Sequence, residues 1–276
     1  MIQPATSHTL GFSLAGPAQG ELIALTHGWA ADSLFTSPIV SLLPNFRFML
    51  IDMPGYGLSA TLTEAAGSVS NTAELLLNTL PGSCHLMSWS LSTLSAIRAA
   101  ASDPGKKIRS LITICGSPKF PASENWPGVP DNYIRKIRRY FVPAKADHVL
   151  NLFFMMQGKS PINDYNVQTF LRESFRLCRE PAFTVLKAGL DEMIETDLRP
   201  EFFRLHLPSL HIFGKCDRLV SCQTAAYTGG HPEKTSVIFE YSAHMPYLTE
   251  PQKFAWWITH FLRRITYPGN APAFAG

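Results

Sequence analysis

Long apolar runs are absent from this chain of 276 residues. No stretch reaches 18 uninterrupted apolar residues, so the sequence predicts no membrane-spanning helix. The first residues, MIQPATSHTLGF, lack the basic and apolar regions of a secretory signal. Charge is scarce as well, because 16% of the residues are charged and the net charge of +3 is too small to indicate nucleic-acid binding. We therefore expect a cytoplasmic monomer that binds neither membranes nor nucleic acid.

Cysteine is also sparse and shows no pairing pattern. The five cysteines are odd in number and none forms a C-x-x-C motif. This usage predicts reduced thiols, not a disulfide framework or a zinc site. No cluster of His, Cys and acidic residues has the spacing of metal ligands, so we expect no metal and no cofactor.

Short apolar segments and helical patterns alternate along much of the chain. Nearly continuous apolar runs are typical of parallel strands that are buried on both faces. Six such runs occur, at 22–29, 46–52, 84–90, 108–116, 209–214 and 235–241. Helical patterns separate them, the clearest at 251–264, where apolar residues recur every three or four positions. The alternation predicts an α/β fold with a mostly parallel central sheet flanked by helices.

The alternation breaks between residues 118 and 199. This segment begins with the proline-rich GSPKFPASENWPGVP and contains helical patterns but no convincing strand. It predicts an inserted helical cap over the sheet edge where ligands bind. We expect one discontinuous core domain, made of 1–117 and 200–266, with the cap at 118–199 and a flexible tail at 267–276.

Four serines lie in the stretch HLMSWSLSTLS at 85–95. A nucleophile elbow is a sharp strand-to-helix turn, and the residues two positions before and after its nucleophile must be small. Only Ser90 meets this condition, because its flanking residues are Ser88 and Ser92, whereas every other frame places a bulky or branched side chain there. Both flanking positions are usually glycine, so an ordinary helix start with serine caps remains the alternative.

Partners for this serine follow two later strands. Asp217 follows the segment 209–214, and His244 follows the last predicted strand. The order Ser90, Asp217, His244 is that of the α/β-hydrolase fold, which predicts a catalytic triad. The backbone N–H groups of Trp29, in HGW, and of Leu91 would form the oxyanion hole.

Other residues compete for these roles. Asp197 and Glu240 are alternative acids, but neither directly follows the penultimate strand. We expect His211 to be a core residue and His27 to shape the oxyanion loop. A redox role for Cys216 is disfavoured because no neighbour in the sequence would activate its thiolate.

Several motifs make a more specific resemblance. HGW, SWSLS, ENWPGV, FFMMQ, ETDLRP and GKCDRLV together resemble the pimeloyl-acyl-carrier-protein methyl ester esterases of biotin synthesis, over about residues 22–261. The resemblance implies a serine carboxylesterase that hydrolyses the methyl ester of pimeloyl-acyl carrier protein. It also implies substrate contacts at Trp29, Leu91, Phe153 and Gln157. Family members typically have G-W-S-L-G around the nucleophile, so the two flanking serines are departures.

The predicted cap carries the excess of positive charge. Only two of the 24 Lys and Arg residues lie in the first 100 positions, whereas 131–180 holds nine basic and five acidic residues. Acyl carrier proteins are strongly acidic, so a positive face suits such a partner. The candidate docking residues are Arg135, Arg138, Arg139, Arg172, Arg176 and Arg179. An ordinary solvated face is the alternative for these arginines.

Two other functions remain open from the residues alone. One is a broad short-chain carboxylesterase or a C–C bond hydrolase of the same fold. The other is a catalytically silent binding protein with this fold, which the loss of both elbow glycines suggests.

Overall fold

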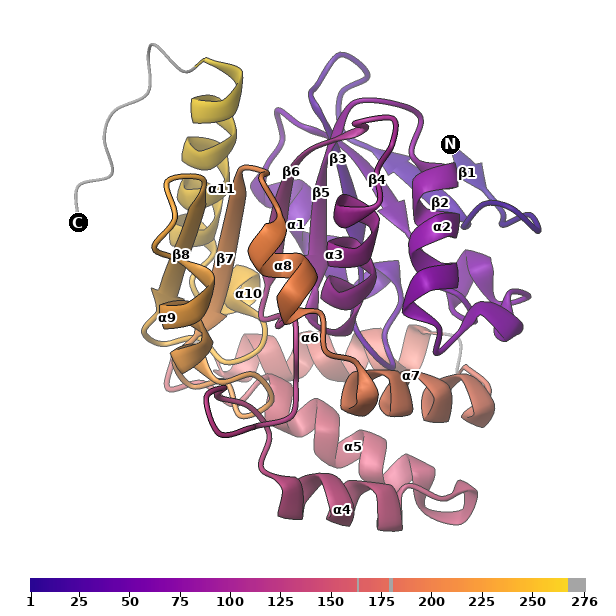
Figure 1. Ribbon diagram of the computed structural model, residues 1–276. Helices are drawn as coiled ribbons and strands as arrows, with labels where there is room; N and C mark the ends of the chain where they lie inside the picture. Colours follow the sequence, from indigo (N-terminus) through magenta and orange to yellow (C-terminus); the bar gives the residue numbers. More distant parts are fainter. Residues whose placement is uncertain (163, 179–180, 268–276) are drawn as a thin grey trace.

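A central sheet of eight strands organises the molecule (Figure 1). The computed structural model describes residues 1–162, 164–178 and 181–267. The strand order is β1-β2-β4-β3-β5-β6-β7-β8, and all pairs from β4 to β8 are parallel. The strands are β1 (Ile2–Gln3), β2 (Phe12–Ala15), β3 (Leu22–Thr26), β4 (Arg47–Ile51), β5 (Cys84–Trp89), β6 (Ile108–Ile114), β7 (Ser209–Gly214) and β8 (Lys234–Phe239).

The six strands predicted from apolar runs are confirmed, and the predicted α/β fold with them. The sequence analysis missed β1 and β2, which extend the sheet with antiparallel pairing at the β4 edge. Both strands are short, and β1 is exposed while β2 is half-buried. They therefore lack the continuous apolar run that marks a strand buried on both faces.

Helices cover both faces of the sheet, and alternate strand residues point to different helices. Leu25 packs with α1 (Pro38–Leu42) and α11 (Pro251–Thr266), whereas Ala24 packs with α2 (Val69–Thr79) and α3 (Thr93–Ala101). This is the two-residue period of a strand. The predicted apolar stripe of α11 is buried through Phe254, Ile258, Phe261 and Leu262.

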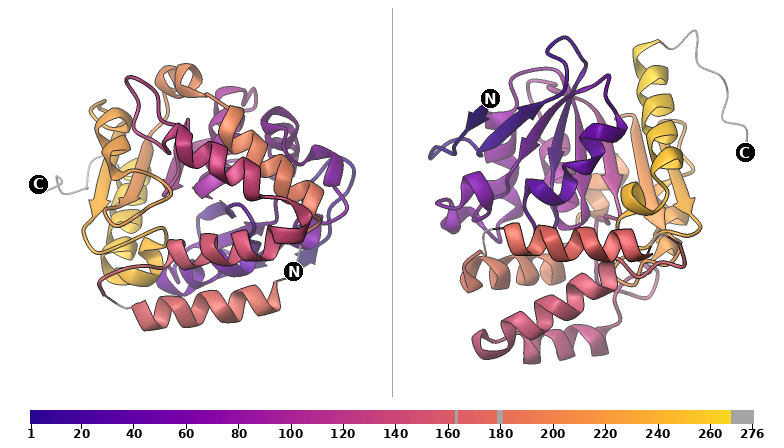
Figure 2. Two further views of the ribbon diagram at one scale, coloured as in Figure 1. Left: turned by 90° about the horizontal axis from the view of Figure 1, so that it is seen from below. Right: turned by 180° about the vertical axis from the view of Figure 1, so that it is seen from behind.

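The segment between β6 and β7 forms helices below the sheet, as the views from below and behind show (Figure 2). They are α4 (Asp131–Tyr140), α5 (Ala146–Gln157), α6 (Asp164–Leu177) and α7 (Phe183–Glu195), and α8 (Arg199–Arg204) leads back to β7. Among the described residues of 118–199 only isolated bridges form, and no strand. The division into core and cap domains remains a prediction.

The predicted tail, 267–276, lies outside the described residues apart from Tyr267. Nowhere in the described chain does a helix have both the length and the apolar character needed to cross a membrane.

Candidate active site

Ser90 lies where β5 ends and the helical turn Ser90–Ser92 leads into α3. Its φ of 60° is in the left-handed region, which a non-glycine residue rarely adopts without strain. The side chain is buried, and its Oγ lies 2.8 Å from His244 Nε2. The chain therefore turns sharply at the serine that the size of its neighbours had indicated.

The two serines that replace glycine around Ser90 have hydrogen-bonding partners. The hydroxyl of Ser88 lies 3.2 Å from Thr93 Oγ1. The hydroxyl of Ser92 accepts from Thr26 Oγ1 at 2.9 Å and donates to the Trp89 carbonyl at 3.1 Å. Buried hydroxyls are tolerated when they are hydrogen-bonded, so the turn accommodates both side chains.

His244 and Asp217 complete a chain of hydrogen bonds with Ser90. His244 lies in the loop after β8 and Asp217 in the loop after β7, and Nδ1 of the histidine is 2.7 Å from Oδ2 of the aspartate. The other aspartate oxygen, Oδ1, accepts from the backbone N–H groups of Leu219 and Val220. A carboxylate can only accept, so Nδ1 carries the imidazole proton and Nε2 is free to accept from the serine hydroxyl.

The loop after β3 lies against the nucleophile. A Cβ added at Gly28 would come within 2.9 Å of Ser90 Cβ, so this close approach requires glycine. Trp29 follows Gly28, and Leu91 follows Ser90 at the start of the helical turn. The Trp29 indole donates to the carbonyl of Leu186 in α7 at 2.8 Å. Leu91 is therefore adjacent to Ser90 in the chain, and Trp29 follows the glycine that lies against Ser90. The catalytic role of this predicted oxyanion-hole pair remains a prediction.

His27 connects the loop after β3 to the loop after β4 by hydrogen bonds. Its Nε2 accepts from the Met53 backbone N–H at 2.9 Å, and its Nδ1 therefore donates to the Gly28 carbonyl. Asp52 accepts from the backbone N–H groups of Ser33 and Leu58, one on each carboxylate oxygen. The loops after β3 and β4 are held together in this way, and His27 shapes the first of them.

His211 is a core residue. It is buried in β7, where Nδ1 lies 2.8 Å from Thr113 Oγ1 and Nε2 lies 3.0 Å from Ser209 Oγ. Burial lowers the pKa of His211 to about 3. A neutral, hydrogen-bonded imidazole agrees with the structural role expected from its place in a strand.

Phe153 and Gln157 both lie on α5, and each contacts a residue of the site. The Phe153 ring meets the Trp29 ring edge-on, with centroids 4.8 Å apart. Gln157 is buried, and its backbone carbonyl accepts from the His244 N–H at 3.0 Å. Its side-chain Oε1 finds no hydrogen-bond partner among the described residues. The structure thus brings the two cap residues against Trp29 and His244, respectively.

The candidate docking arginines differ in their pairing. Arg135 pairs with Asp131, and Arg138 pairs with Glu195. Arg139 lines an open basic depression on α4, together with Arg135, Lys136 and Tyr140. On α6, Arg172 and Arg176 are both exposed, whereas Arg179 lies outside the described residues.

Among the residues that the structure describes, two groups of potential metal ligands come together, although their spacing in the sequence gave no signal. One is Cys115 with Asp217 and His244, and the other is formed by the exposed residues His206, His231 and Glu233. Burial raises the pKa of the Cys115 thiol well above its usual value, so the thiol stays protonated and is a poor ligand. The second group precedes β7 and β8, at the sheet edge opposite Ser90.

Glu192 of α7 is a residue that the sequence analysis missed. It lines a small cavity of about 40 Å³ with Tyr56, Trp29 and Leu91, and Ser90 is not among the lining residues. Burial raises the pKa of Glu192 to about 7. A glutamate in a helical segment gives no signal of burial in the sequence, because its surroundings come from loops far away in the chain.

We expect Glu192→Gln to make folding stability less dependent on pH. The folded-state pKa of about 7 exceeds the ordinary 4.5, so the folded chain binds the extra proton and stability falls as the pH rises from about 4.5 to 7. When the pH rises from 5 to 8, the free energy of unfolding of the wild type should fall by about 2 kcal/mol because of Glu192. The variant should not show this fall. Chemical denaturation at both pH values checks it, with the exposed Glu195→Gln as control. Equal pH dependence in the wild type and Glu192→Gln would contradict the assignment.

Comparisons with known proteins agree with this geometry. The profile described as the Alpha/beta hydrolase family matches residues 23–255. The pimeloyl-[acyl-carrier protein] methyl ester esterase of Aeromonas hydrophila subsp. hydrophila is 32% identical over 246 residues, covering 88% of this chain and 96% of the relative. The enzyme of that name from Serratia marcescens is 32% identical, with coverage of 90% and 95%.

Solved structures share the fold at lower identity. The esterase EaEST from Exiguobacterium antarcticum has a TM-score of 0.77 at 18% identity, covering 95% of this chain and 98% of its own. The esterase RhEst1 from Rhodococcus sp. ECU1013 has a TM-score of 0.79 at 15% identity, with coverage of 98% and 99%. The relatives of higher identity confirm the predicted class of enzyme, a carboxylic ester hydrolase. With the family profile covering most of its length, the chain belongs to the alpha/beta hydrolase family.

Proposed function

We propose that this enzyme hydrolyses the methyl ester of pimeloyl-acyl carrier protein in biotin synthesis, through Ser90, His244 and Asp217. The observation that carries the proposal is the name shared by relatives of about 30% identity that align over most of both chains. The hydrogen-bonded chain from Ser90 to Asp217 supports the mechanism, because it joins a nucleophile, a base and an orienting acid.

The reaction begins when Ser90 Oγ attacks the ester carbonyl while His244 Nε2 takes the hydroxyl proton. Asp217 accepts from Nδ1 and stabilises the imidazolium that forms. The backbone N–H groups of Trp29 and Leu91 bind the developing oxyanion. Methanol leaves with the proton from Nε2, and the acyl group stays on Ser90. Water then gives a proton to His244 and attacks the acyl-enzyme, which releases the pimeloyl carboxylate and restores Ser90.

The acyl chain has an apolar path beside the nucleophile. Phe153 packs edge-on against Trp29, which also contacts Phe141 at 5.4 Å between ring centroids. Trp29 lies in the loop after β3, Phe141 in the segment that links α4 to α5, and Phe153 in α5 itself. They would contact the methylene groups, and Gln157 is buried at the end of α5, where its backbone carbonyl accepts from the His244 N–H.

The carrier protein would dock on the basic surface of the cap. Arg139, Arg172 and Arg176 are exposed there, and 131–180 carries nine basic against five acidic residues. Opposite charges speed association and are screened by salt, with a Debye length of about 8 Å at 0.15 M. A cytoplasmic location, where such a carrier would be met, remains a prediction.

Raising the salt from about 0.05 to 0.5 M should lower kcat/KM on the carrier-bound ester at least about tenfold. The rate on a small soluble methyl ester should change little, because no charged partner docks. Arg139→Glu combined with Arg176→Glu should produce the same selective loss. Arg263→Glu, an exposed arginine on α11 away from the cap, is the matched control. Equal salt dependence on both substrates would exclude carrier docking by this surface.

The physiological substrate is tested by growth. The gene should restore growth without biotin to a bacterium that lacks its own pimeloyl-methyl esterase, and a Ser90→Ala gene should not. Failure to restore growth, with rapid cleavage of many short esters, would identify a broad carboxylesterase instead. Failure of both would indicate the silent binding protein.

A further inference from the structure

The main chain of His244 is held from two sides. Its carbonyl accepts from the Trp89 indole Nε1–H at 2.9 Å, and its N–H donates to the Gln157 carbonyl at 3.0 Å. All three residues are buried, so water does not compete for either hydrogen bond. The first bond comes from the core strand β5 and the second from the end of the cap helix α5.

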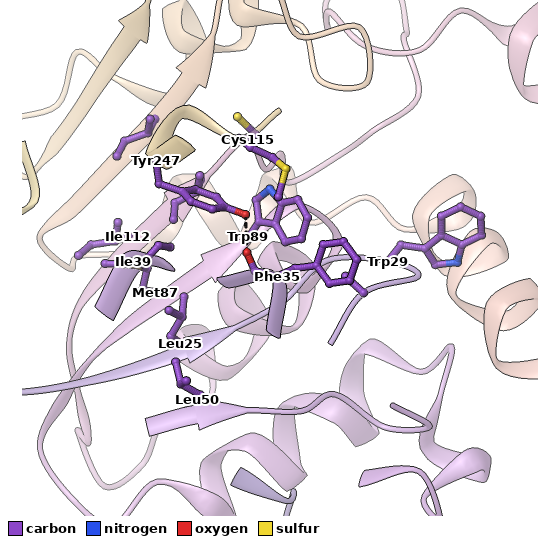
Figure 3. Packing of buried hydrophobic residues seen from close by; sticks show 14 of the residues in the cluster. Leu25, Trp29, Phe35, Ile39, Leu50, Met87, Trp89, Ile112, Cys115 and Tyr247 are labelled. Atoms are coloured by element: carbon purple, nitrogen blue, oxygen red, sulfur yellow. Dashed lines mark hydrogen bonds between the residues drawn. The ribbon is translucent and has the colours of Figure 1, made fainter. Parts of the chain in front are cut away.

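Trp89 is well suited to fix a position. Its indole is fully buried between Phe35, stacked at 6.4 Å, and Tyr247, edge-on at 6.2 Å (Figure 3). Tyr247 in turn donates its hydroxyl hydrogen to the Phe35 carbonyl at 2.9 Å. Packing on both sides leaves the ring one orientation, and Trp89 is bonded covalently to Ser90. One rigid side chain thus links the nucleophile and the base.

The cap holds the same loop at a second point. The hydroxyl of Ser160, three residues after the end of α5, has two acceptors, the carbonyl of Tyr241 and the carbonyl of Ile162. Tyr241 lies three residues before His244. Together with the bond from His244 to Gln157, this contact fastens the end of α5 to the loop that carries the base.

We propose that Trp89 is a positioning residue that sets the place of the His244 imidazole relative to Ser90, with the end of α5 as a second support. The inference rests on the proposed function, since it requires His244 to act as the base. Misplacing a reacting group by about 1 Å costs about 100-fold in rate, so a backbone anchor beside the base affects the chemical step.

The test is Trp89→Phe, which keeps an aromatic ring but removes the donor to the His244 carbonyl. We expect kcat on a small ester to fall about 10- to 100-fold while KM stays within about twofold. Trp126→Phe is the matched control, since its buried indole also donates to a carbonyl, that of Lys119 at 2.8 Å, far from the triad. It should lose thermal stability to a similar extent yet keep its kcat.

A second variant keeps the proposal testable if Trp89→Phe does not fold. Ser160→Ala removes the contact with the Tyr241 carbonyl, together with the local bonds of the hydroxyl to Ile162, and should lower kcat about threefold with KM unchanged. The proposal is overturned if folded Trp89→Phe keeps its kcat, if Trp126→Phe loses as much, or if Trp89→Phe unfolds and Ser160→Ala keeps full kcat. Ser90→Ala, measured alongside, distinguishes failure of the positioning role from failure of the proposed function. If Ser90→Ala stays active, the proposed mechanism itself fails, whatever the result for Trp89→Phe.

Discussion

Ser90→Ala is expected to lower kcat on a methyl ester by about 10⁴-fold or more. The variant loses the oxygen that attacks the carbonyl and keeps the oxyanion-hole backbone, so KM should change little. The variant should still fold, because the hydrogen bond that Oγ makes in the structure is with the His244 imidazole. Steady-state hydrolysis of a small ester checks the result.

Ser95→Ala is the control for this experiment. Its hydroxyl lies in the same serine-rich stretch but donates to the Ser92 carbonyl within the helix. We expect its kcat to stay within severalfold of the wild type. A Ser90→Ala enzyme that retained most of its rate would exclude Ser90 as the nucleophile.

Asp217→Asn should lower kcat by about 10³- to 10⁴-fold. The amide can still accept from the Leu219 and Val220 N–H groups on one side, so the loop should keep its shape. On the other side it presents N–H to His244 Nδ1 and forces the wrong tautomer, which leaves Nε2 protonated and unable to accept from Ser90. The loss should fall on kcat, measured across the pH range in which the wild type is active.

Asp197→Asn provides the matched comparison, because Asp197 was the competing acid in the sequence. It lies on the surface in ion pairs with Arg199 and Lys119, and the Arg199 guanidinium holds its pKa well below the usual range. Its loss should leave kcat almost unchanged. If Asp197→Asn lowered kcat and Asp217→Asn did not, Asp217 would be excluded as the acid of the triad.

Much of the fold could be predicted because parallel strands that are buried on both faces have nearly continuous apolar sequences. The position of Ser90 was also accessible, since a tight turn selects small residues on both sides and only one serine met that condition. The antiparallel strand β2 could not be found this way, because half-buried residues carry a weaker signal.

Contacts between segments that are far apart in the chain could not be predicted from the sequence. The raised pKa of Glu192 depends on loops that only the fold brings around it. The bond from Trp89 to the His244 carbonyl spans 155 positions and involves a main-chain acceptor, which no residue type reveals. Pairing of Arg138 with Glu195 likewise depends on how α4 and α7 lie together, so the number of free cap charges was not readable from composition.

The central claim is that Ser90 attacks the substrate and is activated by His244. Reaction with a fluorophosphonate, followed by peptide mass spectrometry, measures this directly. The account predicts one phosphonyl group per chain on the peptide that contains Ser90, at a rate that Asp217→Asn lowers by orders of magnitude and Asp197→Asn does not. An adduct on another residue, or an active enzyme that takes up no label, would contradict it.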